Sequence, residues 1–373
     1  MLAQLGIGSK TTHIGLDLGA TGVRAAQLRR VGGVWQVTCA AQRGLFAARE
    51  PEAGVAAESQ IEIMRQCVSG ESFSGRTVAI AMPHGEMKYH ALELPDAVLT
   101  QDAETANDMA RVEISRLMTA APDHVEADHW MLPRTQAAGP NAMGLGVRSQ
   151  VAVDAVARCE RAGLSCVRAD ASALALQRIG CGLRRWGERE VWGMLDLGHT
   201  GTRLVLSLGV TPVLIRDVGA GGLAWTQRIA ETLQIGEKAA EIQKREHGIA
   251  LAGRGIRRDG DGPPHSELGG IIFGALRGML GDIAGEIKRS YEYILSHYGI
   301  EEAGDLILTG GSAGLTNLGV FLSQSLGIDV RCAGEETDRE SKIELPSASG
   351  TPWPRFALAI GLALNREAIA REY

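Results

Sequence analysis

The sequence predicts an α/β protein with two lobes, in which one structural unit occurs twice. A segment of strand-like and turn-forming residues near the N-terminus returns in the second half of the 373-residue chain. Strand-like and helix-like stretches alternate between and after the two copies, which is typical of α/β proteins with buried sheets. A third, glycine-rich segment follows an apolar run closer to the C-terminus.

The repeated segment has the pattern of a β-hairpin. An apolar run that begins at Ile14 contains Asp17, a turn of small residues follows, and Arg24 lies in a second apolar run. Asp196 and Arg203 recur at the same spacing in the second copy. One such turn is weak evidence, but two with equal spacing indicate duplicated domains. The turn residues are Gly19, Ala20, Thr21 and Gly22 in the first copy and Gly198, His199, Thr200 and Gly201 in the second.

The third segment reads as a strand, a glycine turn and a helix. The apolar run 305–309 leads into Gly310, Gly311 and Ser312, and apolar residues with helical spacing follow from Leu315. This order predicts free backbone N–H groups at a helix N-terminus, where an anion or the polar edge of a ligand is well received.

Apolar periodicity assigns most of the remaining chain. We expect strands at 76–82 and 164–170, helices at 101–119, 172–181, 224–233, 237–247 and 281–297, and at 149–162 a strand that runs into a helix. The stretch 252–267 is rich in Gly, Arg, Asp and Pro and predicts an exposed loop.

Composition excludes several classes of protein. The formal net charge is −6, so a dedicated nucleic-acid binder is not expected. No continuous apolar run approaches the roughly 20 residues that span a bilayer, and no secretory signal is readable, so we expect contact with a membrane only through a partner. The six cysteines include no Cys-x-x-Cys pair and predict reduced thiols in the cytoplasm.

The two hairpins and the third glycine segment favour a nucleotide as ligand. Turns of small residues expose N–H groups that can hold phosphate oxygens. Asp17 and Asp196, next to those turns, are suited to hold hydrated Mg²⁺, which prefers one or two carboxylates together with water and substrate phosphates. Tight turns without a ligand are the simpler alternative for any one of these segments. A P-loop and the common hydrolase and zinc-protease motifs are absent from the sequence.

These residues resemble the actin/Hsp70/sugar-kinase superfamily of ATP-binding folds. The hairpins are similar to its two phosphate loops, and the segment 308–313 is similar to its adenosine loop. More narrowly, the chain resembles the PilM family, the actin-like cytoplasmic components of type IV pilus assembly. The resemblance extends over nearly the whole length and includes Tyr89–Pro95, Ala110–Ser115, Val125–Trp130 and Ala162–Asp170.

The resemblance implies a duplicated, ribonuclease-H-like actin fold with an inserted subdomain 1C. Its implied boundaries are 1–88, 150–185 and 352–373 for subdomain 1A, 89–149 for 1C, 186–217 and 270–351 for 2A, and 218–269 for 2B.

The resemblance also implies the roles of individual residues toward ATP and Mg²⁺. Asp17 and Asp196 would hold Mg²⁺ through water. Asp170 lies where the superfamily places the residue that orients the attacking water, and a cap at the end of its strand is the equal alternative. Gly221 and Gly222 precede a helix near the ligand. Glu241 and Lys244, three apart on one helix face, would meet ribose and adenine, unless they belong to a solvated, salt-bridged face.

The chain departs from the family pattern in its first phosphate turn. The family usually has serines there and a lysine at the position of Arg24, whereas this turn offers only the hydroxyl of Thr21. Arginine reaches phosphate, but its planar fork is not interchangeable with an ammonium group. We therefore expect ATP binding with weak or no ATPase activity.

Two relatives and one further class remain as alternatives. A filament-forming, FtsA-like division protein would carry a terminal amphipathic helix, and a ROK sugar kinase would carry a zinc cluster and an Asn-Asp base; neither feature is readable here. A scaffold that has lost nucleotide binding is the third alternative. The partner implied by the PilM resemblance is a PilN-like inner-membrane protein whose cytoplasmic N-terminal peptide docks between subdomains 1A and 1C, and self-association stays open.

Overall fold

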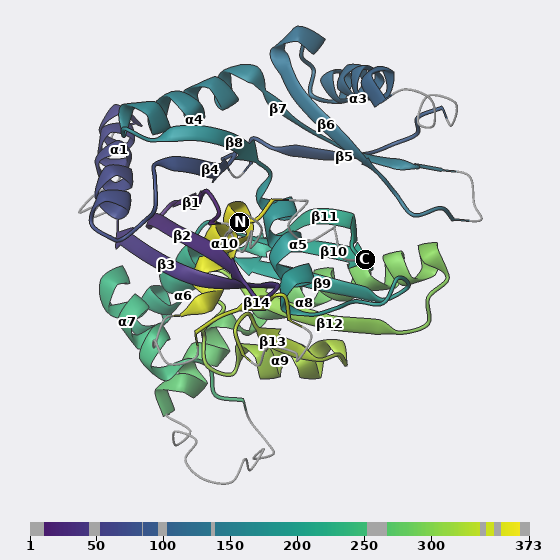
Figure 1. Cartoon of the computed structure of the whole chain (residues 1–373). Helices are drawn as coiled ribbons and strands as arrows, with labels where there is room; N and C mark the ends of the chain where they lie inside the picture. The colour runs from purple at the N-terminus through teal and green to yellow at the C-terminus, as the bar shows by residue number, and fades with distance from the viewer. Residues whose placement is uncertain are drawn as a thin grey trace.

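We describe residues 11–44, 53–83, 85–95, 103–135, 139–251, 267–335, 341–346 and 352–365 of a computed structural model of the chain. Two large sheets form the centre of the molecule, and a smaller sheet lies to one side (Figure 1).

The first large sheet has the strand order β14-β3-β2-β1-β4-β8. The strands β1, β2 and β3 are antiparallel, whereas β4 and β8 run parallel to β1. Their bounds are β1 Ile14–Gly19, β2 Gly22–Val31, β3 Val34–Gly44, β4 Thr77–Ala81, β8 Ser165–Asp170 and β14 Ile343–Glu344.

The second large sheet repeats this plan in the order β11-β10-β9-β12-β13. Three antiparallel strands are again followed by two parallel ones. Their bounds are β9 Val191–Leu197, β10 Gly201–Leu208, β11 Thr211–Ala220, β12 Ala303–Thr309 and β13 Val330–Cys332. The predicted duplication is therefore confirmed, and it extends from the hairpin to five strands.

Helices cover both faces of the sheets. Their bounds are α1 Ala53–Ser69, α3 Ala103–Leu117, α4 Ser149–Arg161, α5 Ser172–Leu183, α6 Gly222–Leu233, α7 Glu237–His247, α8 Glu267–Tyr298, α9 Leu318–Leu326 and α10 Ala357–Ala363, with short 3₁₀ turns η1 at Pro122–His124 and η2 at Trp353–Phe356. Side chains of α1 and α4 pack on the outer face of the first sheet, and those of α6, α8 and α9 on the outer face of the second.

The helices α5 and α10 lie between the two sheets and share one core with both (Figure 1). Leu28 of the first sheet and Met194 of the second belong to this cluster, as does Ile360 of α10. Trp192 stacks on Trp186 with ring centroids 4.3 Å apart. Because this middle layer packs on both sheets, the two lobes are joined along their inner faces.

The smaller sheet is an insertion between β4 and α4. It has the order β5-β7-β6, with β5 Lys88–Leu92, β6 Val125–Met131 and β7 Ala142–Arg148, and α3 packs on one face. It also reaches the second lobe, because the Trp130 Nε1–H donates to the Pro212 carbonyl at 2.8 Å and Leu132 and Met143 join the second lobe's core. The division into subdomains 1A, 1C, 2A and 2B stays a prediction.

Two expected elements differ from the structure, and a third is almost wholly outside the described residues. Residues 149–161 are helical throughout, and the strand precedes them as β7. The helix expected at 281–297 begins at Glu267, because Ile272 and Leu276 extend its buried stripe toward the N-terminus. The expected loop at 252–267 lies outside the described residues except at Glu267, which begins α8.

Helix α8 is also long and apolar enough to cross a membrane by length and composition alone, which the search for continuous apolar runs did not reveal. A third of its most apolar window is buried, and the buried positions, including Ile272, Leu280 and Ile287, belong to the core of the second lobe. Length and composition alone are weak evidence for a membrane span, and one face of α8 packs in the second lobe.

We predict that Gly361→Ala destabilises the protein, because α10 approaches α5 most closely at this residue. A Cβ atom on Gly361 would lie 2.0 Å from the Ala175 carbonyl oxygen, and overpacking of this kind costs about 1–3 kcal/mol. Gly274→Ala on α8 is the matched control, since no atom lies within 4 Å of its Cβ position, and it should stabilise by about 0.5–1 kcal/mol. Urea unfolding of both variants checks this, and equal stability of Gly361→Ala and wild type would contradict the packing.

Candidate nucleotide site between the lobes

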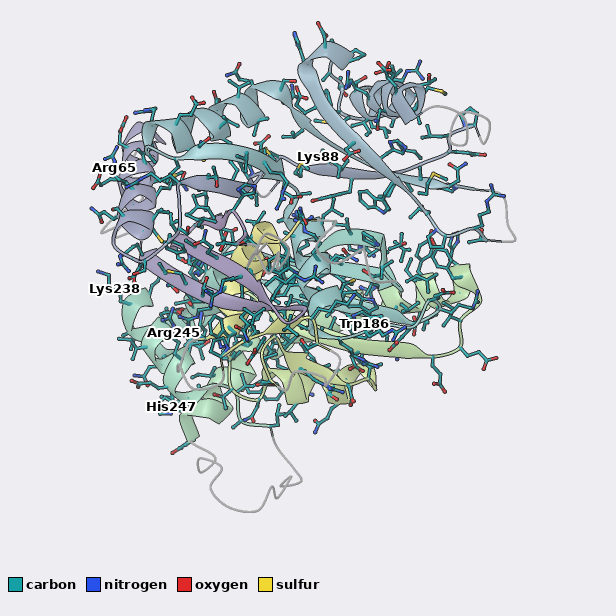
Figure 2. All side chains as sticks on the ribbon, in the orientation of Figure 1. Arg65, Lys88, Trp186, Lys238, Arg245 and His247 are labelled. Carbon is teal, nitrogen blue, oxygen red and sulfur yellow. The ribbon has the colours of Figure 1, made fainter. Side chains whose placement is uncertain are left out.

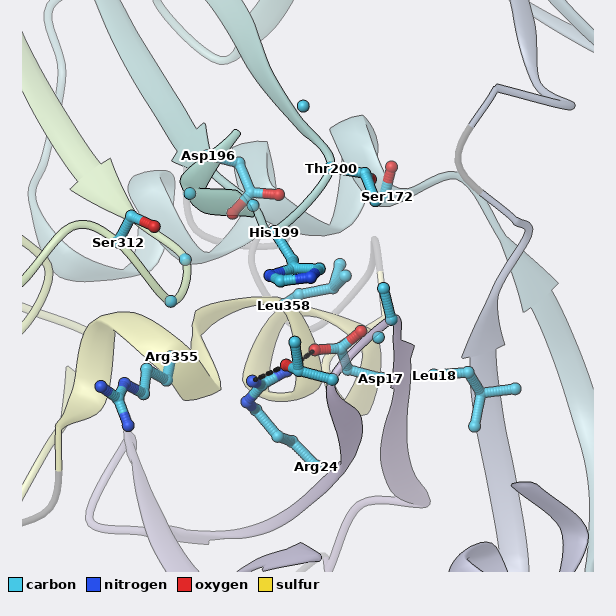
Figure 3. Close-up of a pocket in the computed structure, with 18 of the residues that line it drawn as sticks. Asp17, Leu18, Arg24, Ser172, Asp196, His199, Thr200, Ser312, Arg355 and Leu358 are labelled. Atoms are coloured by element: carbon cyan, nitrogen blue, oxygen red, sulfur yellow. Dashed lines mark hydrogen bonds and ion pairs between the residues drawn. The ribbon is translucent and has the colours of Figure 1, made fainter. Parts of the chain in front are cut away.

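A cavity of about 580 Å³ lies where the two hairpins face each other. The turns of β1–β2 and β9–β10, the loop after β12, the helix α7 and the turn η2 all contribute to its wall. Figure 3 shows Asp17, Asp196, Ser312 and Arg355 around it. Most of the residues predicted for the site line this one cavity: Asp17, Gly19, Ala20, Thr21, Arg24, Asp196, Gly198, His199, Thr200, Gly201, Gly222, Glu241, Lys244, Gly310, Gly311 and Ser312. Gly22, Gly221 and Asp170 are not among the lining residues.

The first hairpin holds its carboxylate in an ion pair. Asp17 and Arg24 are cross-strand partners in β1 and β2, and an Arg24 Nη1–Asp17 Oδ2 distance of 3.2 Å joins them. Both side chains are buried. Burial raises the pKa of Asp17, and the Arg24 guanidinium opposes that rise. The Arg24 Nη2–H also donates to the Thr21 hydroxyl at 3.4 Å, so the arginine ties the turn to the strand below it.

The second hairpin has the same cross-strand pair, Asp196 and Arg203, but the two side chains do not meet. Arg203 points away and donates to the Asp217 carboxylate at 2.9 Å and to the Ser172 hydroxyl at 3.0 Å. Among the described residues, Asp196 accepts only a hydrogen bond of 3.4 Å from the Thr309 hydroxyl and has no ion-pair partner. The duplication therefore places one neutralised and one unpaired carboxylate at the cavity.

This asymmetry is reflected in the pKa of Asp196. Burial and the negative charge of Asp17 raise the pKa of Asp196 to about 6. The positive charges of Arg203 and Arg24 lower this pKa and offset the rise only in part. An anion held there without a partner is costly unless a cation approaches.

Backbone hydrogen bonds from the start of α6 hold the turn of the second hairpin in place. The Gly222 and Leu223 N–H groups donate to the Gly198 and His199 carbonyls at 2.9 and 2.8 Å. A Cβ atom on Gly221 would lie 2.5 Å from the His199 carbonyl oxygen, so Gly221 allows the turn to rest on the helix without lining the cavity itself. The His199 ring projects into the site (Figure 3), and burial lowers its pKa, so it is neutral at pH 7.

Glu241 and Lys244 form a salt-bridged network in which Lys244 is buried and Glu241 is half-buried. The Lys244 ammonium donates to Glu241 at 2.6 Å, to the Thr226 hydroxyl at 2.7 Å and to the Gly222 carbonyl at 3.0 Å. Glu241 also accepts from Arg245 at 2.7 Å. Lys244 therefore fastens α7 to the start of α6 at the edge of the cavity.

The third glycine segment differs from the prediction. Helix α9 begins at Leu318, after a series of turns, so Gly310 and Gly311 do not form a helix N-terminus. The Gly310 N–H donates to the Pro354 carbonyl and the Ser312 N–H to the Leu197 carbonyl, which uses two of the amides expected to be free. Gly310 has φ +91°, and a Cβ atom there would lie 2.6 Å from the Asp196 carboxylate, so a glycine leaves room for that side chain.

Asp170 does not line the cavity, and its role toward the attacking water stays a prediction. It accepts hydrogen bonds from Arg168 and Arg178, and its own carboxylate caps the Ala171 N–H. The Arg168 guanidinium also donates a hydrogen bond to the Leu362 carbonyl at the end of α10. A carboxylate held by two guanidinium groups outside the cavity is a poor general base, and Asp170 joins β8, α5 and α10.

Several lining residues carried no readable signal in the sequence. They are Leu18, Gln42, Gln60, Ala81, Met82, Pro83, Arg158, Ser172, Arg245, Pro354, Arg355 and Leu358. Of these residues, Arg245 on α7 (Figure 2) could have been found most easily from the sequence. It lies four residues after Glu241 and therefore on the same helix face.

The chemistry of the lining fits an anionic ligand accompanied by a cation. Five basic side chains and three carboxylates line the cavity of a chain whose net charge is negative. The Arg24 and Arg158 Nε atoms are buried there without a hydrogen-bond partner. No group of three or more metal-ligating side chains occurs within the described ranges, so a cation would need ligand oxygens in addition to Asp196.

We predict that Asp196→Asn stabilises the nucleotide-free protein increasingly as the pH rises from 4 to 7. Because the folded-state pKa of Asp196 lies above the ordinary value, its protonation favours the fold at low pH, and that contribution is lost as the pH passes through about 6. The difference in free energy of unfolding between variant and wild type should grow by on the order of 3 kcal/mol. Urea unfolding at a series of pH values measures it, and a difference independent of pH would rule out a raised pKa.

Comparison with known proteins places the chain in a family. A family model described as type IV pilus assembly protein PilM matches residues 15–251. No curated protein sequence matches the chain.

Two solved structures are similar in fold. One is a PilM–PilN type IV pilus biogenesis complex, with 20% identity, a TM-score of 0.68 and coverage of 94% of this chain and 97% of that chain. Another is the ethanolamine utilization protein EutJ from Carboxydothermus hydrogenoformans, with 15% identity, a TM-score of 0.55 and coverage of 95% and 89%. With the duplicated sheets, these likenesses confirm the predicted two-lobed actin-like fold. The chain belongs to the PilM family of type IV pilus assembly proteins.

Proposed function

We propose that this protein binds ATP with Mg²⁺ between its lobes and serves as a cytoplasmic adaptor that connects nucleotide state to a PilN-like inner-membrane partner. The observation that carries the nucleotide proposal is the unpaired, buried carboxylate of Asp196, which faces the Asp17–Arg24 pair across a cavity with a basic lining. A scaffold without a ligand gains nothing from such a carboxylate, because burying it costs stability.

Different residues of the cavity would bind the metal and the phosphates. Asp196 would hold the hydrated cation, which supplies charge neutralisation between the carboxylate and the phosphates. The Thr21 and Thr200 hydroxyl groups, one on each hairpin, both line the cavity and would donate to phosphate oxygens. Arg24 keeps Asp17 neutralised, so Asp17 would contribute less to the metal than Asp196 does.

The proposal is for binding with weak or no turnover. The carboxylate expected to orient the attacking water, Asp170, is engaged by two arginines outside the cavity. His199 is neutral and lines the cavity, but no carboxylate bonds to its ring to orient it among the described residues. Such a site is suited to a nucleotide-dependent switch.

We predict that Asp196→Asn weakens binding of Mg-ATP by about 10- to 100-fold, since a charge-assisted contact is worth about 1.5–3 kcal/mol. Asp17→Asn should weaken it less, because the substitution also frees the Arg24 guanidinium for phosphate. Without Mg²⁺, Asp196→Asn should bind ATP at least as tightly as wild type, since a repelling charge is removed.

Isothermal titration of the three proteins with and without Mg²⁺ provides the measurement. Asp282→Asn on the exposed face of α8 is the matched control and should leave both affinities unchanged. Equal Mg-ATP affinities in wild type and Asp196→Asn would contradict the proposed metal role.

The partner proposal rests on the open edge of the first sheet beside the insertion. Strand β8 is the last strand of that sheet, and its Val167 side chain is 48% exposed. The insertion begins after β4, the neighbour of β8, so an extended peptide in this region would meet both units (Figure 1). Such a peptide could add to the sheet through main-chain hydrogen bonds, a mode that suits a short cytoplasmic tail. A PilM relative of this fold was solved as a complex with PilN.

We predict that Val167→Arg abolishes recruitment of the protein to the membrane fraction of cells, because a long charged side chain would obstruct the apolar edge. Val210→Arg is the matched control, since this valine is similarly exposed, at 44%, but follows β10 in the second lobe. Fractionation of cells that express each variant, with thermal melting as a test of folding, gives the result. Membrane recruitment of a folded Val167→Arg protein would place the docking surface elsewhere.

A further inference from the structure

The cavity contains an arginine, Arg355, that belongs to no motif of the sequence. Arg355 lies on η2, immediately after Pro354, whose carbonyl accepts the Gly310 N–H at 2.8 Å. The neighbours Trp353 and Phe356 are buried and meet edge to face at 6.0 Å. The backbone of Arg355 is therefore fixed beside the glycine loop after β12, and only its side chain is free to meet a ligand.

Most basic side chains of the cavity are already engaged. Arg24 is paired with Asp17, and Lys244 and Arg245 are both paired with Glu241. Among the described residues that line the cavity, the Arg355 guanidinium has no hydrogen-bond or ion-pair partner. Arg158, on α4, shares this property, but we select Arg355 because two further guanidinium groups, those of Arg245 and Arg24, act on it.

The surroundings of Arg355 carry an excess of positive charge. Burial, together with Arg245 and Arg24, lowers its pKa, and Glu241 is the one carboxylate that acts against this effect. Glu241 is itself bound to Lys244, Arg245 and Thr226. A neutral base of a nucleotide would leave the repulsion among these guanidinium groups in place. A phosphate, with several negatively charged oxygens, would relieve it.

We propose that Arg355 binds a phosphate group of the nucleotide, as the unpaired member of three arginines, Arg24, Arg245 and Arg355, that line the cavity. Figure 3 shows Arg24 and Arg355 in it. This inference deepens the proposed function and rests on it. It assigns to η2, which lies outside both hairpins, a direct contact with the charged part of the ligand. The planar fork of arginine suits phosphate in a way that lysine does not reproduce.

The test compares Arg355→Gln, Arg355→Lys and wild type by competition against a fluorescent ATP analogue. The competitors are ATP, tripolyphosphate, which has charge and no base, and adenosine, which has a base and no charge. Arg355→Gln should weaken ATP and tripolyphosphate by about 10- to 100-fold and leave adenosine unchanged. The affinities of Arg355→Lys for ATP and tripolyphosphate should fall between those of Arg355→Gln and wild type, because lysine keeps the positive charge but lacks the planar guanidinium.

Arg228→Gln is the matched control, since it removes the same charge from an exposed position on α6 and should change none of the affinities. Thermal melting should show all variants folded, because the Arg355 side chain has no hydrogen-bond or ion-pair partner among the described residues. Unchanged ATP affinity in Arg355→Gln, or an equal loss for adenosine and ATP, would overturn the inference while the proposed function stands. Absence of nucleotide binding by wild type would overturn both.

Discussion

The chemistry of the site depends on two buried carboxylates that face each other across the junction of the lobes. Asp17 and Asp196 occupy equivalent positions in duplicated hairpins, so the fold that pairs the two sheets also brings two like charges together. Arg24 neutralises one of them, while Arg203, its counterpart, is turned toward Asp217. The site is consequently short of one positive charge at Asp196, and a metal–nucleotide complex is a ligand that supplies it.

The rest of the structure keeps those hairpins in position. The layer formed by α5 and α10 packs on both sheets, and close backbone approaches at Gly15 and Gly361 allow α10 to lie directly against β1 and α5. Asp170, with Arg168 and Arg178, fastens the same layer to the edge of the first sheet. The insertion contacts the second lobe through Trp130 and Leu132, so a peptide docked beside it would lie next to an element that both lobes hold.

Much of this arrangement could be predicted from the sequence, because the duplicated hairpin and the alternation of strands and helices are local patterns. The contacts that give the site its chemistry are not local. The sequence places an Asp and an Arg at equal spacing in both hairpins, but Ser172 and Asp217, which draw Arg203 away from Asp196, come from other elements. Asp170 could not be assigned for the same reason, since its partners include Arg178 on α5. Arg355 belongs to no motif and reaches the cavity only because Pro354 is bound to the Gly310 loop.

The most direct measurement of the central claim is a crystal structure grown with Mn²⁺ and a non-hydrolysable ATP analogue, with the metal located by anomalous scattering. Our account predicts a metal peak whose water shell contacts the Asp196 carboxylate, with the phosphates held between the two hairpin turns. A nucleotide bound in the cavity with its metal away from Asp196, or with no metal, would contradict it.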